Sequence, residues 1–185
     1  MSYNYTIRKT AQVSNQEPPK GSPPSYWMKL KGELIKLPNL KSEVKTILNS
    51  ADKIVFDAQR PSDKADAIAY VSSADKDNNG KIDKIHFVLP NMPQSVPDNQ
   101  FTQFLSQMAG VLMHEEAHIE DFDPNKEVFN HGEDIAEMAG DAAERAAASA
   151  LASQLPTDVK LAYYRGLLSK MAKEFNSDKV GKITR

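Results

Sequence analysis

The chain has 185 residues, of which 40% are hydrophobic and 26% charged, a composition that is typical of a globular protein with a buried core. Its 23 basic and 25 acidic residues are well mixed and give a formal net charge of −2, so we expect neither a nucleic-acid partner nor a membrane partner. There is no cysteine, which excludes disulfides and thiolate ligands; a bound metal must use His, Asp or Glu.

The first 24 residues are predicted to be a flexible tail, because residues 17–25 contain four prolines and one glycine. One domain is expected over residues 25–176, followed by a second flexible tail over residues 177–185. The N-terminus lacks the apolar run of a secretory signal, and no stretch approaches the roughly 18 apolar residues of a membrane span. The default expectation is a cytoplasmic protein, with export by a route without a cleaved signal as the alternative.

Short helices and then strands are predicted for the first half of the domain. Apolar residues recur at helical spacing over residues 26–35; Pro38 ends that helix and Asn39 can cap a second one. Three later segments have the composition of strands: residues 53–57, 65–71 and 81–89. In the last of these, successive side chains point to opposite faces of the strand. One face carries Ile85, Phe87 and Leu89, and the other carries Lys84, His86 and Val88.

The segment between the second and third strands has two interpretations. Residues 75–80, Asp-Lys-Asp-Asn-Asn-Gly, carry the signal of a hairpin turn. The same segment resembles a calcium loop, although its twelfth position is His86 instead of a bidentate Glu. The calcium ligands on this interpretation would be Asp75, Asp77, Asn79, Lys81 and Asp83.

Two long helices are predicted for the second half of the domain. The first begins at Asp98 or Asn99, carries a stripe of apolar residues, and ends at residues 121–124. The second covers about residues 132–154 and is rich in alanine, so that a neighbouring helix can approach it closely. A last helix is expected to start near Asp158.

The first long helix contains the motif His114-Glu115-x-x-His118. Positions four apart share one face of a helix, so both imidazoles can bind a single metal ion. Two neutral nitrogens suit Zn²⁺, which lowers the pKa of a bound water to about 7, and Glu115 stands where it can accept the water's proton.

A catalytic zinc site needs a third protein ligand. A third histidine in the tight HExxHxxGxxH arrangement is excluded, because Asp121 and Pro124 stand at the required Gly and His positions. On the second long helix, Glu137 and Asp141 share one face, so that one can bind metal while the other supports a ligand from behind. Two competitors lie on about the same face of that helix: Glu133, which capping also explains, and Glu144.

HExxH on one helix and Glu-x-x-x-Asp on the next resemble the gluzincin metallopeptidases. The resemblance implies an α+β, zincin-like fold with a small mixed or antiparallel sheet and an active-site helix followed by a glutamate-bearing helix. It implies that Glu115 is the general base and that the zinc ligands are His114, His118 and Glu137. Asp141 would orient His114, and an edge strand over residues 84–89 would pair with an extended peptide substrate.

Several further roles and one rival function stay open at this stage. His131 is either a helix-start residue or a donor to the transition state. Tyr163 and Tyr164 could supply a transition-state hydrogen bond or be ordinary core or surface residues. The expected function is a zinc-dependent metallopeptidase with a peptide or protein substrate. The alternative is a non-catalytic structural or interaction protein that binds calcium or no metal.

Overall fold

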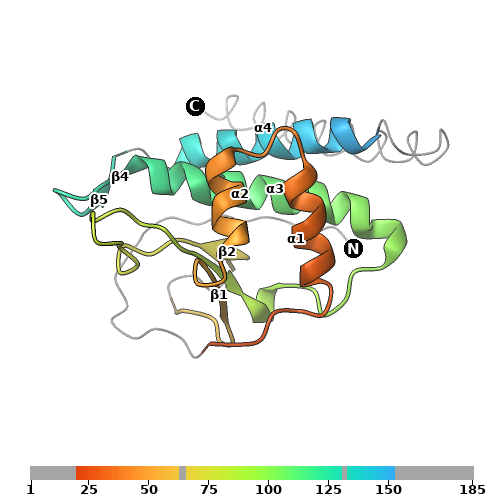
Figure 1. Ribbon diagram of the computed structural model, residues 1–185, viewed down its shortest axis with the longest axis horizontal. Coiled ribbons are helices and arrows are strands. Elements are labelled where there is room, and N and C mark those ends of the chain that lie inside the picture. Colours follow the sequence, from red (N-terminus) through yellow and green to blue (C-terminus); the bar gives the residue numbers. More distant parts are fainter. Residues whose placement is uncertain (1–19, 63–65, 131–132, 153–185) are drawn as a thin grey trace, which may run out of the picture.

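The structure is a computed structural model that describes residues 20–62, 66–130 and 133–152. This part of the chain combines helices with two small sheets, which confirms the predicted α+β class (Figure 1). Most of the N-terminal tail, the predicted last helix and the C-terminal tail lie outside the described residues. None of the described helices combines the length and the apolar composition needed to cross a membrane.

The larger sheet is mixed and has three strands, in the order β1-β3-β2. Strand β1 (Ile54–Asp57) pairs with β3 (Ile85–Val88) in parallel, and β2 (Ala69–Tyr70) pairs with the other side of β3 in antiparallel orientation. The prediction of an edge strand over residues 84–89 is wrong, because β3 is the central strand and has a neighbour on each side. All four of its residues are buried, so its two faces do not divide into an apolar and an exposed one.

The N-terminal end of the described chain covers the outer edge of β1. Lys20 forms a β-bridge with Asp57, and the Gly21 N–H donates to the carbonyl of Phe56 over 2.6 Å. A Cβ atom at Gly21 would lie 2.3 Å from Leu89 Cδ1, so a larger residue there would require the flexible end of the Leu89 side chain to move. Residues 20 and 21 therefore extend the sheet region, although the sequence places them in the tail.

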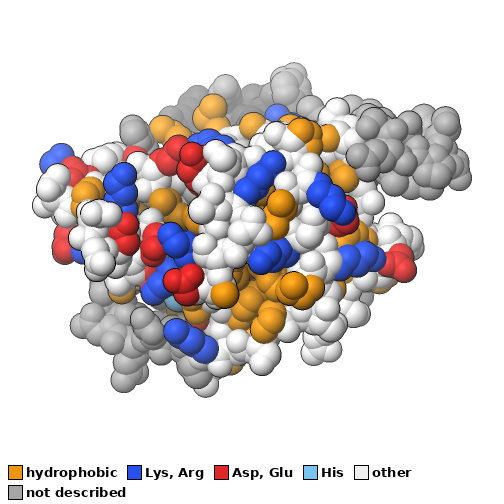
Figure 2. Space-filling model, viewed as in Figure 1, with side chains coloured by type: hydrophobic (Ala, Val, Ile, Leu, Met, Phe, Trp, Pro, Cys, Tyr) orange, Lys and Arg blue, Asp and Glu red, His pale blue; other side chains and the backbone are white. Residues whose placement is uncertain are grey.

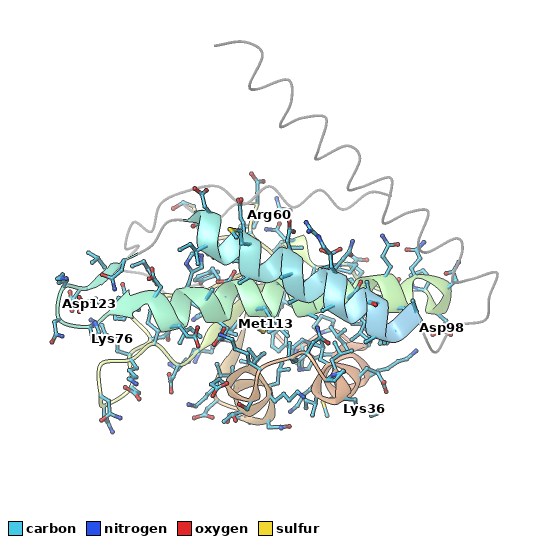
Figure 3. All side chains as sticks on the ribbon, turned by 90° about the horizontal axis from the view of Figure 1, so that it is seen from above. Lys36, Arg60, Lys76, Asp98, Met113 and Asp123 are labelled. Atoms are coloured by element: carbon cyan, nitrogen blue, oxygen red, sulfur yellow. The ribbon has the colours of Figure 1, made fainter. Side chains whose placement is uncertain are left out.

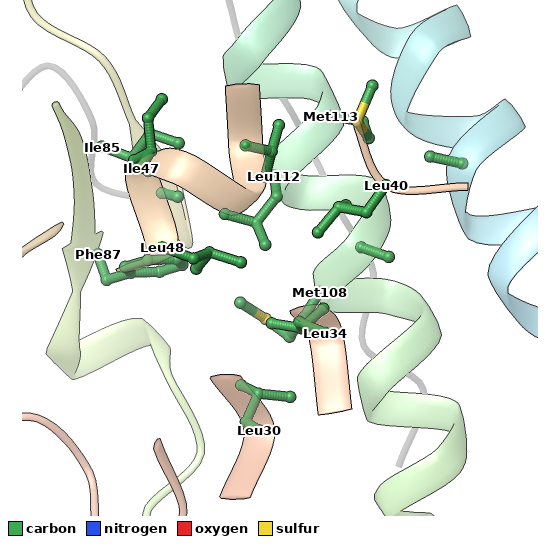
Figure 4. Packing of buried hydrophobic residues seen from close by; sticks show 14 of the residues in the cluster. Leu30, Leu34, Leu40, Ile47, Leu48, Ile85, Phe87, Met108, Leu112 and Met113 are labelled. Atoms are coloured by element: carbon green, nitrogen blue, oxygen red, sulfur yellow. The ribbon is translucent and has the colours of Figure 1, made fainter. Parts of the chain in front are cut away.

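Helices α1 (Trp27–Lys36) and α2 (Ser42–Asn49) bury one side each, as their apolar spacing predicts. Figure 4 shows their leucines meeting residues from β3 and α3 in the main hydrophobic core. Asn39 does not cap α2; its Nδ2 donates instead to the carbonyl of Ala143 over 3.2 Å. A short 3-10 helix, η1 (Leu89–Asn91), follows β3. Figure 2 shows basic and acidic side chains interspersed over the face that α1 and α2 form.

The two long helices are α3 (Asp98–Asp121) and α4 (Glu133–Ala152), which lie side by side and run in opposite directions (Figures 1 and 3). Between them the chain forms a hairpin of β4 (Phe122–Asp123) and β5 (Val128–Phe129), which the sequence analysis treats as a loop. The α4 face against α3 consists of small buried residues: Ala136, Gly140, Ala143 and Ala147. These small side chains allow the two helices to pack closely.

Candidate metal centre

The two histidines of the HExxH motif lie together at the C-terminal half of α3. The Nε2 atoms of His114 and His118 are 3.1 Å apart, and their rings meet edge to face with centroids separated by 4.8 Å. His114 is buried, whereas His118 is partly exposed. The predicted sharing of one helix face is therefore confirmed, and both rings direct the same nitrogen atom toward a common point.

A carboxylate from α4 completes this arrangement. Glu133 Oε2 lies 3.4 Å from His114 Nε2 and 3.4 Å from His118 Nε2. Within the described residues, these three side chains are the group of His and acidic residues that could hold a metal ion, with ligand atoms within 4.8 Å of one another. The structure thus brings together the two predicted histidines and a glutamate that the sequence left as a competitor.

The charges in this cluster reinforce one another. Contact with His114, and then with His118, lowers the pKa of the Glu133 carboxyl far below its usual range, although burial opposes this effect. Burial lowers the pKa of His114, but Glu133 and the nearby charge of Glu115 outweigh burial, so that its pKa is raised. Glu133 is therefore ionised at neutral pH, and the cluster attracts positive charge.

One ligand atom of the cluster lacks a hydrogen bond within the described residues. Glu133 Oε2 is buried and forms no hydrogen bond within the described residues. Buried polar atoms without partners are costly, and a bound ion is one recognised reason for them. Three ligand atoms held 2.0–2.1 Å from one tetrahedral ion would be about 3.3 Å apart. The observed separations of 3.1, 3.4 and 3.4 Å fit that requirement, so this donor set could hold one metal ion.

The position of Glu133 along α4 explains why it reaches the histidines. The two helices meet at Gly110 and Gly140, where a Cβ atom on either residue would lie 3.0 Å from the carbonyl oxygen of the other. The histidines lie four and eight positions beyond this point on α3, an axial distance of about 6 and 12 Å. On the antiparallel helix Glu133 is about 10 Å from the same point, whereas Glu137 is only about 4.5 Å from it.

Glu137 and Asp141, the residues predicted to complete the site, are not part of the cluster. Both side chains are exposed, although the charge of Glu137 contributes to the raised pKa of His114. Asp141 forms an ion pair of 3.3 Å with Arg145, one turn along the same helix. The Nδ1 atom of His114, which Asp141 was expected to orient, is buried and has no hydrogen-bond partner among the described residues.

The two glutamates of the motif have different surroundings. Glu115, the predicted general base, is buried next to His114, whose pKa its charge helps to raise. Glu116 is also buried, but it accepts a 2.8 Å hydrogen bond from Lys41 at the start of α2. Lys41 also binds Glu120, so it joins α2 to the solvent side of α3. Glu116 therefore has a structural role, whereas Glu115 is the motif glutamate that lies beside His114.

Aromatic contacts support His118, and the sequence analysis missed them. Phe129, on β5, meets the His118 ring edge to face at 5.6 Å, and Phe122 packs against Phe129 at 5.4 Å. The available signal was the turn-type segment Asp123-Pro124-Asn125 between the two phenylalanines. The predicted residue His131 and the tyrosines Tyr163 and Tyr164 lie outside the described residues.

The acidic side chains of the predicted calcium loop are directed to other partners. Asp75 is buried and binds both Lys84, at 2.9 Å, and His86, at 2.8 Å. Asp83 forms an ion pair with Lys53 on the approach to β1, at 3.1 Å. Two of the expected ligands thus bind cationic side chains within the protein.

The middle of this loop has the geometry of a tight turn. Asp77 Oδ1 accepts hydrogen bonds from the backbone N–H groups of Asn79, at 2.8 Å, and Lys81, at 2.9 Å. Gly80 adopts a φ of 76°, in the left-handed region that favours glycine, and Lys76 pairs with Ile82 across the turn. The contacts favour the hairpin interpretation over the calcium site.

A second cluster of histidine and carboxylates lies in the sheet, and the sequence analysis did not predict it. His86 on β3 contacts Asp57 through Nδ1, at 3.1 Å, and Asp75 through Nε2, at 2.8 Å. Tyr70 donates to Asp57 over 2.7 Å and stacks on the His86 ring. Burial opposes protonation of His86, but its two carboxylate partners together raise its pKa to about 9.

Comparison with protein-family models, with curated proteins and with solved structures finds no match to this chain. The function of the chain must therefore be inferred from the geometry and chemistry of His114, His118 and Glu133.

Proposed function

We propose that the protein is a zinc-dependent metallopeptidase of zincin-like architecture. The observation that carries the proposal is the meeting of three ligand atoms from an HExxH helix and a following helix, with separations of 3.1, 3.4 and 3.4 Å. His114, His118 and Glu133 would hold the metal. Glu133 replaces Glu137 in this proposal because Glu133 is the glutamate in contact with both imidazoles.

Zinc is the metal that this donor set suits best. Two imidazole nitrogens and one carboxylate oxygen at tetrahedral spacing are typical of catalytic zinc sites, which keep a fourth position open. A single zinc there would supply Lewis acidity toward a peptide carbonyl and would acidify a water molecule. His118 is partly exposed, so a substrate could approach the cluster from its side.

Glu115 would hold and transfer the proton during hydrolysis. Its carboxylate is buried and lies close enough to His114 for its charge to raise the pKa of that histidine, which suits a desolvated base beside the metal. It would accept a proton as the water attacks and would then deliver that proton to the leaving amine. Because Glu116 is bound to Lys41, it does not compete for this role.

The substrate would be a peptide or an unfolded protein segment. A peptide that extends a sheet must pair with an edge strand, and β3 is central. Since Lys20 and Gly21 occupy the outer edge of β1, the remaining edge within the described part of the chain is that of β2, the antiparallel strand. The expectation of an edge strand for substrate binding is therefore transferred from residues 84–89 to β2.

The proposal is tested by Glu115→Gln in zinc-loaded protein, with a mixture of internally quenched peptides as the substrate. We expect one zinc per chain in both the parent and the variant by elemental analysis. Hydrolysis should fall by about 10²-fold or more in the variant, because amide replaces the proton-accepting carboxylate. His118→Ala should lose the metal together with the activity.

The matched control is Glu116→Gln, the same change at the adjacent buried position. It should keep both zinc and the rate of hydrolysis, since an amide can still accept the hydrogen bond from Lys41. Zinc-free parent protein, or calcium as the bound metal, would contradict the proposal. Equal hydrolysis by the parent and the Glu115→Gln variant would show that the assigned mechanism is wrong.

A further inference from the structure

The two long helices approach each other through a pair of glycines. A Cβ atom at Gly110 would lie 3.0 Å from the carbonyl oxygen of Gly140 and 3.1 Å from Glu144 Cβ. A Cβ atom at Gly140 would lie 3.0 Å from the carbonyl oxygen of Gly110 and 3.2 Å from His114 Cβ. These neighbours are backbone oxygens and Cβ atoms and not the flexible ends of side chains, so the helices would have to move to accept a methyl group.

This contact is directly connected to the metal cluster. His114 is one turn beyond Gly110, and its Cβ atom is the neighbour that a side chain at Gly140 would meet. Glu133 is on the same rigid helix as Gly140, about two turns away. Any displacement of α4 from α3 at the glycines therefore changes the distance between Glu133 Oε2 and the two Nε2 atoms.

Close helix packing alone does not account for the two glycines. Much of the contact face of α4 consists of alanines, such as Ala136, Ala143 and Ala147, which already have the small side chains needed for a close approach. Glycine inside a helix is less favourable than alanine, because the unfolded chain loses more conformational freedom. At Gly140 the missing Cβ creates the space that the His114 side chain and the Gly110 carbonyl occupy.

We propose that Gly110 and Gly140 are positioning residues that set the spacing between the histidine pair and Glu133 and thereby the affinity for zinc. This inference rests on the proposed function, since it concerns the same metal ion. It assigns part of the metal affinity to two residues that carry no ligand atom.

The test is Gly140→Ala, with Gly32→Ala as the matched control. Gly32 is also inside a helix, α1, but a Cβ atom there meets nothing within 4 Å. We expect zinc affinity, measured by competition with a chromophoric chelator, to fall at least 10-fold in Gly140→Ala, in the range found for residues that orient metal ligands. In Gly32→Ala the affinity should be unchanged, and the thermal midpoint should not fall.

A second variant, Gly110→Ala, keeps the test usable if Gly140→Ala does not fold. Its Cβ atom would press on the Gly140 carbonyl oxygen and on Glu144 Cβ, and no atom of His114 is among its three nearest neighbours, so a smaller loss of zinc affinity is expected. The visible absorption of bound Co²⁺ provides an independent readout, since an altered spectrum reports altered ligand geometry even in a folded protein. Circular dichroism of the metal-free variants shows whether α3 and α4 still form.

The outcomes separate this inference from the proposed function. If the parent binds zinc and cleaves peptides while folded Gly140→Ala and Gly110→Ala bind zinc as tightly as the parent, the positioning role is wrong and the function stands. If the parent binds no zinc, both proposals fail. A graded loss, largest in Gly140→Ala, smaller in Gly110→Ala and absent in Gly32→Ala, supports the positioning role.

Discussion

The protein contains two clusters of histidine and carboxylate that differ in how well the protein itself satisfies them. In the sheet, both nitrogens of His86 contact carboxylate oxygens, and the two carboxylates have further partners in Tyr70 and Lys84. At the helix pair, one oxygen of Glu133 faces two histidine nitrogens at 3.4 Å, and this buried oxygen makes no hydrogen bond within the described residues.

The difference indicates what each cluster is for. Both ring nitrogens of His86 have a carboxylate partner, and the protonated imidazole supplies the positive charge that compensates the negative charge of the carboxylates. The helix cluster directs three ligand atoms toward one point and leaves Glu133 Oε2 without a hydrogen bond within the described residues, as a site for a cation requires. Residue type alone does not distinguish a structural histidine from a metal ligand. The distinction comes from the partners toward which the two ring nitrogens point.

The largest expected effect compares Glu133→Gln with Glu137→Gln in a zinc titration. Loss of a ligand carboxylate should weaken zinc binding by more than the roughly 10–100-fold caused by the loss of an orienting partner. Glu137→Gln should change the affinity only slightly, since its side chain is exposed outside the cluster. A large loss in Glu137→Gln with none in Glu133→Gln would restore the ligand set predicted from the sequence.

His86→Leu should destabilise the fold without altering the metal site. The change leaves the buried Asp57 carboxylate with one partner fewer, and breaking a buried charge pair costs about 3–5 kcal/mol. Urea unfolding of the metal-free protein measures the loss. Adding Asp57→Asn to this variant should recover part of the stability, because it removes the uncompensated charge. An unchanged unfolding midpoint in His86→Leu would contradict a structural role for the sheet cluster.

Raising the pH should weaken the same cluster. The pKa of His86 is raised from about 6.5 to about 9 in the folded protein, so the native state binds the proton more tightly than the unfolded chain. The stabilisation is complete below pH 6.5 and is lost as the pH rises through about 9, a change on the order of 3 kcal/mol. Unfolding of metal-free protein between pH 6 and 10 should show this decline. The decline should be smaller in His86→Gln, and equal pH profiles for the two proteins would exclude His86 as its source.

The smallest effect is expected for Asp141→Asn. This carboxylate is exposed and pairs with Arg145 on the same helix, an arrangement that contributes about 0.3–0.5 kcal/mol. Zinc affinity should therefore stay within about twofold of the parent. A loss of 10-fold or more would indicate that Asp141 orients His114 in the metal-bound protein, as the resemblance to gluzincins implies.

Periodicity in the sequence was sufficient to predict α1, α3 and α4, because each buries one continuous stripe of residues. It also placed both histidines on one face of α3. The choice between Glu133 and Glu137 could not be made in this way, since both lie near the face that packs on α3. That choice depends on where two antiparallel helices meet, and this is fixed by the Gly110–Gly140 contact, which joins residues far apart in the chain.

The sheet was less predictable than the helices for a related reason. The alternation over residues 84–89 is typical of a strand with one solvated face, but pairing on both sides makes β3 central. The polar residue on its second face, His86, is covered by Tyr70 and by the Asp75 turn. Asp75 lies 11 positions from His86 and its other carboxylate partner, Asp57, lies 29 positions away, so local spacing carries no information about them.

The short β4–β5 hairpin keeps all three proposed metal ligands within one stretch of the chain, between residues 114 and 133. Closing such a short loop loses little chain entropy, so α3, the hairpin and α4 can come together before the distant pairings of the sheet form. A metal bound there would hold this helical hairpin together in a partly unfolded chain. Zinc is therefore expected to protect the amide protons of α3 and α4 from exchange more than those of β1 and β3.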